Sequence, residues 1–242
     1  INCCRLTPDG PLHLGEREHW REGSSVCAHS DTIFSAICHN FLLLFGETAL
    51  NNFIHSIKNE NCLKLSSSFP FSNNTYFFPV PNNQMPMYKE HSQIHYIEKT
   101  GFELLLQGSK IENVLNEGKY TIKKSIDTGA PWSFNNEPHV SINRIHNTSQ
   151  EEGGFFHSGR IEYREKSGLF FFYDIADCTL EKQFMASIRL LADEGLGGDR
   201  SSGYGLMHPP EFIEFDLKIP QDYDSYVTIG LYYTSKKKEL SD

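Results

Sequence analysis

Residues 195–205 hold five glycines, one arginine, two serines and one tyrosine within eleven positions. Glycine adopts positive φ angles without strain and allows other backbone to approach closely. The segment directly follows residues 180–194, whose apolar positions Leu180, Phe184, Ile188 and Leu191 have helical spacing. A long helix must therefore end here, and the chain must continue through a tight loop. This glycine-rich loop (residues 195–205) constrains the fold more than any other feature of the sequence.

Two familiar nucleotide-binding motifs do not fit the loop. A P-loop needs Gly-Lys-Ser/Thr, and the loop contains no lysine. A dinucleotide-binding fingerprint needs a third glycine where Arg200 stands after Gly195 and Gly197. The loop nevertheless offers a guanidinium for phosphate, successive backbone N–H groups for an anion, hydroxyls and a ring for base stacking. These parts predict a nucleic-acid site, and a plain surface turn remains the alternative.

The order of apolar patterns predicts an α+β fold. A strand at 1–7 precedes a helix at about 31–45, which Gly46 ends, and a second helix at about 48–58. Further expected elements are short strands at 66–71 and 76–79, a small helix at 101–117, strands at 119–123 and 140–144, a hairpin of 155–163 with 169–175, the helix at 180–194, and strands at 212–217 and 226–233. This order is that of a ferredoxin-like (RRM-type) domain with a large insertion.

Three local details follow from the same patterns. Ser30 is expected to cap the first long helix, and Thr179 the last one. Residues 127–138 are polar and rich in Gly, Pro and Asn, so they are expected to form a mobile segment. The turn of the 155–175 hairpin is placed at Ser167-Gly168.

Composition limits the class of protein. The 242 residues, 38% of them hydrophobic, can bury a substantial core. The six cysteines show no metal-binding spacing, so reduced thiols, a cytoplasmic location and no metal or other cofactor are expected. No apolar run approaches the ~20 residues that span a bilayer, so no membrane association is expected. The net charge of −9 opposes a free-standing RNA binder unless the RNA contact is small and other surfaces meet proteins.

With its elements in this order, the sequence resembles RAMP-superfamily proteins of CRISPR systems. More narrowly, it resembles the 5′-handle-binding subunits of type III-A (Csm) effector complexes. The resemblance covers nearly the whole chain. It rests on residues 11–15, 29–37, 65–71, 78–81, 140–144, 195–205 and 226–232.

The resemblance implies a non-catalytic scaffold. Such a subunit binds the 5′ handle of crRNA, docks onto the large polymerase–nuclease subunit and meets the first copy of the backbone RAMP subunit. It also projects a β-hairpin thumb, which we place within the insertion at about 82–138. Because the family continues beyond 242 residues, residues 1–220 are expected to form the N-terminal RAMP domain. Residues 221–242 would then begin a second ferredoxin-like unit.

Twelve residues are assigned to RNA binding: Gly195, Gly197, Gly198, Arg200, Ser201, Ser202, Gly203 and Tyr204 in the loop, and Arg144, His13, Ser30 and Thr32 elsewhere. Structural roles compete with several of these assignments. Arg200 could pair with Asp193, Glu194 or Asp199, and Arg144 with a surface carboxylate. Ser30 and Thr32 could simply cap a helix, and His13 could be a structural histidine.

Two other function classes remain open. A guide-processing endoribonuclease of the same superfamily would use a histidine as general acid or base, and His13, His29 and His208 are the candidates. Asp31 has no second carboxylate spaced to share a metal ion, so we interpret it as a first-turn helix residue. An RNA-independent interaction scaffold would agree with the acidic charge.

Overall fold

The central strand of the molecule is β11 (Ser167–Ile175), in which the first seven residues are all buried. The computed structural model describes residues 1–15, 23–60, 62–82, 94–116, 121–123, 130–140, 142–143, 148–149, 155–223 and 225–231. One side of β11 pairs with β1 (Asn2–Leu6). The other side pairs first with β3 (Phe69–Ser72) and then with β2 (Leu63–Leu65). Its run of apolar residues is thus covered along both edges and on both faces.

These strands belong to an eight-stranded sheet with the order β12-β1-β11-β3-β4-β5-β6, and β2 also pairs with β11. All the pairings are antiparallel. The remaining strands are β4 (Thr75–Pro79), β5 (Ile94–Glu98), β6 (Thr121–Lys123) and β12 (Glu211–Glu214). The expected α+β class, the first strand and the hairpin of β3 with β4 are confirmed.

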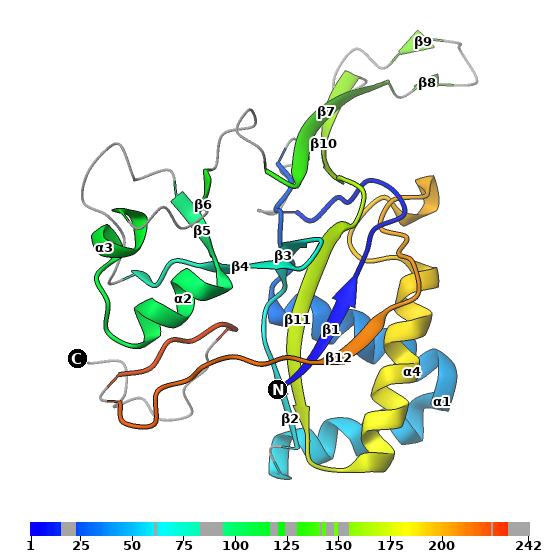
Figure 1. Cartoon of the computed structure of the whole chain (residues 1–242). Helices are drawn as coiled ribbons and strands as arrows, with labels where there is room; N and C mark the ends of the chain where they lie inside the picture. Colours follow the sequence, from blue (N-terminus) through cyan, green and yellow to red (C-terminus); the bar gives the residue numbers. More distant parts are fainter. Residues whose placement is uncertain are drawn as a thin grey trace, which may run out of the picture.

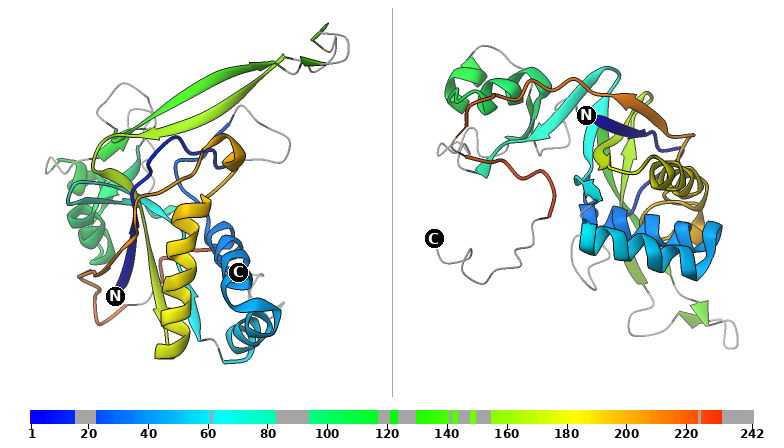
Figure 2. Two further views of the ribbon diagram at one scale, coloured as in Figure 1. Left: turned by 90° about the vertical axis from the view of Figure 1, so that its right-hand side faces the viewer. Right: turned by 90° about the horizontal axis from the view of Figure 1, so that it is seen from below.

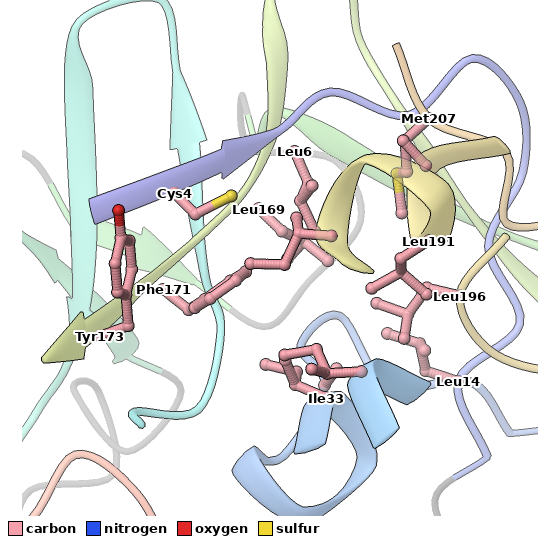
Figure 3. Close-up of a cluster of buried hydrophobic side chains, with 14 of the residues drawn as sticks. Cys4, Leu6, Leu14, Ile33, Leu169, Phe171, Tyr173, Leu191, Leu196 and Met207 are labelled. Atoms are coloured by element: carbon pink, nitrogen blue, oxygen red, sulfur yellow. The ribbon is translucent and has the colours of Figure 1, made fainter. Parts of the chain in front are cut away.

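Two long helices, α1 (Ser30–Glu60) and α4 (Cys178–Glu194), lie side by side on one face of the sheet (Figures 1 and 2). The core on this face takes alternate residues of β11, among them Leu169 and Phe171, together with Ile33 of α1 (Figure 3). Gly46 interrupts α1 with φ 80°, where the sequence predicted a break between two helices. The cap of α4 is Asp177 instead of the expected Thr179, because its carboxylate accepts the N–H groups of the first turn.

The opposite face is covered by α2 (Lys99–Leu106), α3 (Ile111–Asn116) and the segment after β12 (Figure 2). The intervening residues of β11, Phe170 and Phe172, form a second core here with Phe78 of β4 and Phe215. Phe78 stacks on Phe102 of α2, with ring centroids 4.5 Å apart. The single helix expected at 101–117 is therefore two helices, separated near Gly108.

A two-stranded ribbon stands apart from the main sheet and projects from the body (Figure 1). It consists of β7 (Trp132–Val140) and β10 (Phe155–Tyr163), paired in register over nine residues. Near its end, β8 (Ile142–Asn143) pairs with β9 (Thr148–Ser149). The ribbon's base packs into the core through Trp132 and Ile161, whereas Val140 and Phe155 near its end are exposed.

The ribbon corrects two sequence-based predictions. Residues 132–138 form most of a paired strand, so the expected mobile segment at 127–138 is wrong over that part; 127–129 lie outside the described residues. The strands expected at 155–163 and 169–175 exist as β10 and β11, but they do not form a hairpin. The reason is that β11 is already paired along both edges within the main sheet, so β10 turns away toward β7.

The C-terminal part of the described chain differs from its prediction too. Residues 226–231 form no strand, and residues 232 and 233 lie outside the described part. Individual contacts hold the segment instead. The Ser67 N–H donates to the Ile229 carbonyl at 2.9 Å, and the Leu231 N–H donates to Ser30 Oγ at 3.0 Å.

Among the described helices, α1 alone is long and apolar enough, by length and composition, to cross a membrane. Core helices of soluble proteins meet the same criterion, and Ile33, Ile37, Phe41 and Phe53 of α1 are buried in the core. Four apolar side chains near its kink remain exposed: Leu42, Leu43, Leu44 and Phe45.

Candidate nucleic-acid interface

The glycine-rich loop is held tightly at both ends. Gly197 has φ 99°, and a Cβ atom there would lie 2.4 Å from the His13 carbonyl oxygen. Gly205 has φ 81°, and its Cβ would lie 2.3 Å from the Leu196 carbonyl oxygen. No side chain fits at either distance. The positive φ angles also disfavour any residue other than glycine at these two positions. These glycines are required because the backbone of the loop packs directly against other backbone.

Backbone hydrogen bonds join the loop to the segment after β1. Gly198 donates to the His13 carbonyl at 2.8 Å, and Gly205 donates to the Pro11 carbonyl at 2.9 Å. Leu196 of the loop is buried in the core cluster that includes Leu14 and Leu191 (Figure 3). The loop and residues 11–14 therefore form one rigid unit at the end of α4.

The middle of the loop is exposed. Asp199 has a left-handed backbone with φ 54°, and the short 3₁₀ turn η2 (Arg200–Ser202) follows it. Within the described chain Arg200 forms no ion pair, although Asp193, Glu194 and Asp199 are all described. Asp199 instead accepts a hydrogen bond from Ser158 Oγ at 3.3 Å. The competing structural role for Arg200 is thus not found, and its guanidinium is available to a ligand.

A groove of about 850 Å³ runs between the loop, residues 13–15 and one face of α1. It brings together six of the twelve predicted site residues: His13, Thr32, Gly195, Gly197, Gly198 and Arg200. The groove also has lining residues that sequence reasoning missed, namely Ser35, His39 and Asn40 on α1. Thr32, Ala36 and Asn40 recur every four residues, so helical spacing could have placed them on one face. The volume lies within the ~300–1,000 Å³ range of pockets for small organic ligands.

The other six predicted residues have different positions. Ser201, Ser202 and Gly203 are exposed in the turn beyond the groove. Ser30 is buried, and its hydroxyl accepts the Leu231 N–H, so it neither caps α1 nor faces the groove. The structural burial of Tyr204, which is 9% exposed, leaves no ring face for base stacking. Arg144 lies outside the described residues.

Tyr204 connects the loop to the ribbon. Its hydroxyl donates to Glu137 Oε2 of β7 at 2.6 Å and accepts from Arg160 Nη1 of β10 at 3.5 Å. Arg160 also forms ion pairs with Glu137 and with Glu162, the latter at 2.9 Å. The hydrogen bond from Tyr204, followed by the positive charge of Arg160, lowers the pKa of Glu137 below its ordinary value. The loop and the base of the ribbon are therefore linked by a charged hydrogen-bond network.

The family follows from comparison with known proteins. The model of the RAMP superfamily matches residues 6–208, from the end of β1 past the glycine-rich loop. The chain belongs to the RAMP superfamily. It is similar to two proteins described as CRISPR system Cms protein Csm4, from Thermococcus onnurineus and Methanocaldococcus jannaschii. Each is 26% identical, over 79% and 94% of this chain respectively. The chain spans 65% of the length of the first relative and 70% of the second.

Solved structures share this RAMP fold. A chain of the crystal structure of the Csm3-Csm4 subcomplex of the type III-A interference complex matches 89% of this chain, with a TM-score of 0.63 and 22% identity. The match covers 70% of that chain. A chain of the Csm1-Csm4 cassette in complex with pppApA matches 90% of this chain and 71% of its own length, with a TM-score of 0.60 and 21% identity.

The candidate catalytic groups of an RNA-cleaving RAMP protein are partly gathered in the groove. His13 and His29 line it, whereas His208 lies beside Asp9, 3.5 Å from its carboxylate. His13 Nδ1 is 2.6 Å from the Gly159 carbonyl, which leaves Nε2 for another partner. Cys27 also lines the groove, but burial raises the pKa of its thiol to about 12, so the thiol stays protonated. Within the described residues, no three His, Cys, Asp or Glu side chains could hold a metal ion together.

Proposed function

We propose that this chain is a non-catalytic subunit of a type III-A CRISPR ribonucleoprotein, in which it binds the 5′ handle of crRNA. One observation carries the proposal. The glycine-rich loop, the segment after β1 and the polar face of α1 converge on a single groove with Arg200 free of any ion pair in the described chain. A guanidinium, backbone N–H groups and small polar side chains suit a phosphodiester backbone.

The partners of the chain are part of the same proposal. The chain anchors the large polymerase–nuclease subunit and contacts the backbone RAMP subunit. Support comes from its similarity to Csm4 and from the related structures, which pair Csm4 with Csm1 and with Csm3. The exposed apolar side chains Leu42, Leu43 and Leu44 on α1 are typical of a surface that another protein covers. The net charge of −9 also favours protein contacts over most of the surface.

The ribbon is the best candidate for the thumb. It projects from the body, and its far part exposes Val140, Ile142 and Phe155. Apolar side chains at such a tip can insert between nucleotides and unstack them. The two strands of the ribbon cover 132–140 and 155–163, so the predicted range of 82–138 includes only part of β7 and none of β10.

We also infer that β1, α1, β2 with β3, β11, α4 and β12 form a ferredoxin-like unit. In their sheet order β1 pairs with β11 and β12 lies beyond β1, whereas β2 and β3 pair with the other edge of β11, as a β-α-β-β-α-β chain requires. In this view, the segment with β5, β6, α2 and α3, together with the ribbon, is the insertion. The division of the chain at residue 220, the second unit and a cytoplasmic location remain part of the proposal.

Reconstitution with labelled guide RNA tests the proposed function. The chain is assembled with the large and backbone subunits, and retention of an intact 5′ handle is measured at several salt concentrations. Arg200→Ala is expected to weaken handle binding roughly tenfold and to reduce the salt slope by about one phosphate contact. Arg189→Ala, an exposed arginine of α4 that does not line the groove, serves as the matched control and should change neither value.

The same experiment separates the two alternatives. His13, His29 and His39 all line the groove, so the endoribonuclease alternative has its candidate general acids and bases there. Cleavage of the guide that His13→Ala abolishes would replace the proposed function with RNA processing. Assembly with both protein partners but no contact between this chain and the handle would leave an RNA-independent scaffold.

A further inference from the structure

Asn40 is a buried polar residue at the inner side of the groove. It lies on α1 two helical turns after Thr32, and it is 1% exposed. Its Oδ1 atom is fully buried and has no hydrogen-bond partner in the described part of the chain. Buried amide groups are nearly always paired, so an unpaired one requires a reason.

A purely structural role does not supply that reason. Asn is a poor helix former, and an apolar side chain would fill this site without an unpaired polar atom. The neighbouring positions Ile37 and Phe41 are both buried apolar residues of the core. Asn40 thus places an amide at the border between this apolar core and a groove suited to a ligand.

The chemistry of the amide indicates the kind of ligand. The side chain presents one acceptor and one donor in a plane, and rotation about its terminal bond exchanges the two positions. Asparagine pairs in this way with adenine, accepting from the N6 amino group and donating to a ring nitrogen. In single-stranded RNA the base edges are unpaired and open to such contacts.

We propose that Asn40 reads an adenine base of the RNA strand that occupies the groove. This inference rests on the proposed function and adds a base preference to it. Arg200 and the N–H group of Gly197 face the backbone of the strand, and one base enters between the glycine-rich loop and α1. The small residues Ser35 and Ala36 leave room for a planar ring beside Asn40.

Binding of short homopolymeric RNAs to the full chain tests the proposal. Fluorescently labelled oligoadenylate, oligouridylate and oligocytidylate of equal length are titrated at low salt. The wild-type chain is expected to prefer oligoadenylate by between about 5-fold and 100-fold. Asn40→Leu should erase this preference while leaving the salt dependence intact, because the phosphate contacts remain. Asn51→Leu, at an exposed position of the same helix, is the matched control and should keep the preference.

Each outcome is decisive. A thermal melt verifies that the Asn40→Leu variant is folded. If this variant does not fold, the Asn40→Ser variant is used in the same titrations. An adenine preference that survives in the variant would show that Asn40 is structural, and would leave the proposed function standing. A preference for oligouridylate or oligocytidylate would overturn the adenine assignment. If the wild-type chain binds none of the three RNAs, or binds all three equally, the inference fails, and handle retention in the reconstituted complex decides the proposed function separately.

Discussion

The two parts of the glycine-rich loop use the same residue type for different purposes. In the anchored part, Gly197 and Gly205 contact backbone so closely that no side chain fits. In the exposed part, Gly203 also has a positive φ of 85°, but a Cβ atom there would meet nothing within 4 Å. Positive φ alone therefore does not identify a glycine that packing requires.

The comparison extends to the side chains. Leu196 and Tyr204 in the anchored part are buried, and Tyr204 is bonded to the base of the ribbon. Arg200, Ser201 and Ser202 in the exposed part have side chains that face solvent. We interpret the anchored part as the structural support that fixes the position of the exposed part beside the groove. Changes in the first should lower stability, and changes in the second should lower binding.

Gly197→Ala tests this division most strongly. The new methyl group would lie 2.4 Å from the His13 carbonyl oxygen, at a backbone φ of 99°. Clash and backbone strain together are expected to lower the free energy of unfolding by about 3 kcal/mol. Urea denaturation measures the change. Gly203→Ala is the matched control, with only the left-handed strain of about 1 kcal/mol. Equal losses in the two variants would contradict the division of the loop.

Tyr204→Phe is the next largest expected effect. The variant keeps the buried ring and removes the hydroxyl that donates to Glu137. A typical hydrogen bond contributes a net of about 1 kcal/mol to stability, and we expect a loss of that size in urea denaturation. The control is Tyr223→Phe. Because Tyr223 is exposed, removal of its hydroxyl should change the free energy of unfolding little. If Tyr204→Phe is as stable as wild type, the contact between loop and ribbon does not stabilise the anchored part.

Much of the main sheet and its two long helices could be predicted from the sequence. The break at Gly46, the apolar stripe of α1 and the helix before the glycine-rich loop all follow from 3.6-residue spacing that a buried helix face imposes. The hairpin of β3 with β4 follows from aromatic residues on either side of a short polar turn.

The ribbon could not be predicted, because its stability does not come from a strict alternation of polar and apolar residues. β7 carries Pro138 and adjacent asparagines, a composition typical of a loop. Only Trp132 and Phe134 at its base join the core, and the rest of the strand is held by pairing with β10. Local patterns likewise could not reveal that β10 leaves its sequence neighbour β11 for the distant β7.

The site was predicted in part for a similar reason. Six predicted residues line the groove, since glycine clusters and residues after a first strand are local signals. The roles of Ser30 and Tyr204 depend on partners 201 and 67 residues away, which no local pattern specifies. Asn40 had one readable signal, a polar residue beside the buried positions Ile37 and Phe41 of an apolar helix stripe.

The stability loss in Tyr204→Phe should also depend on pH, and this smaller effect tests whether Tyr204 belongs to the anchored part of the loop. The pKa of Glu137 is lowered from its ordinary value of 4.5, first by the Tyr204 hydrogen bond and then by Arg160. A lowered folded-state pKa stabilises the protein above the unfolded-state value, and this contribution is lost as the pH falls through the folded-state pKa. The stability difference between wild type and Tyr204→Phe should therefore be full at neutral pH and shrink below about 4.5.

Tyr163→Phe provides the control for this titration. The Tyr163 hydroxyl donates to the Val26 carbonyl at 2.6 Å, and a backbone carbonyl does not titrate in this range. Loss of the Tyr163 hydroxyl should therefore lower the free energy of unfolding by the same amount at neutral and at acid pH. If the stability difference between wild type and Tyr204→Phe is also independent of pH, the Tyr204 hydroxyl does not lower the pKa of Glu137. In that case Arg160 alone would hold the ribbon's carboxylate, and the anchored part of the loop would end before Tyr204.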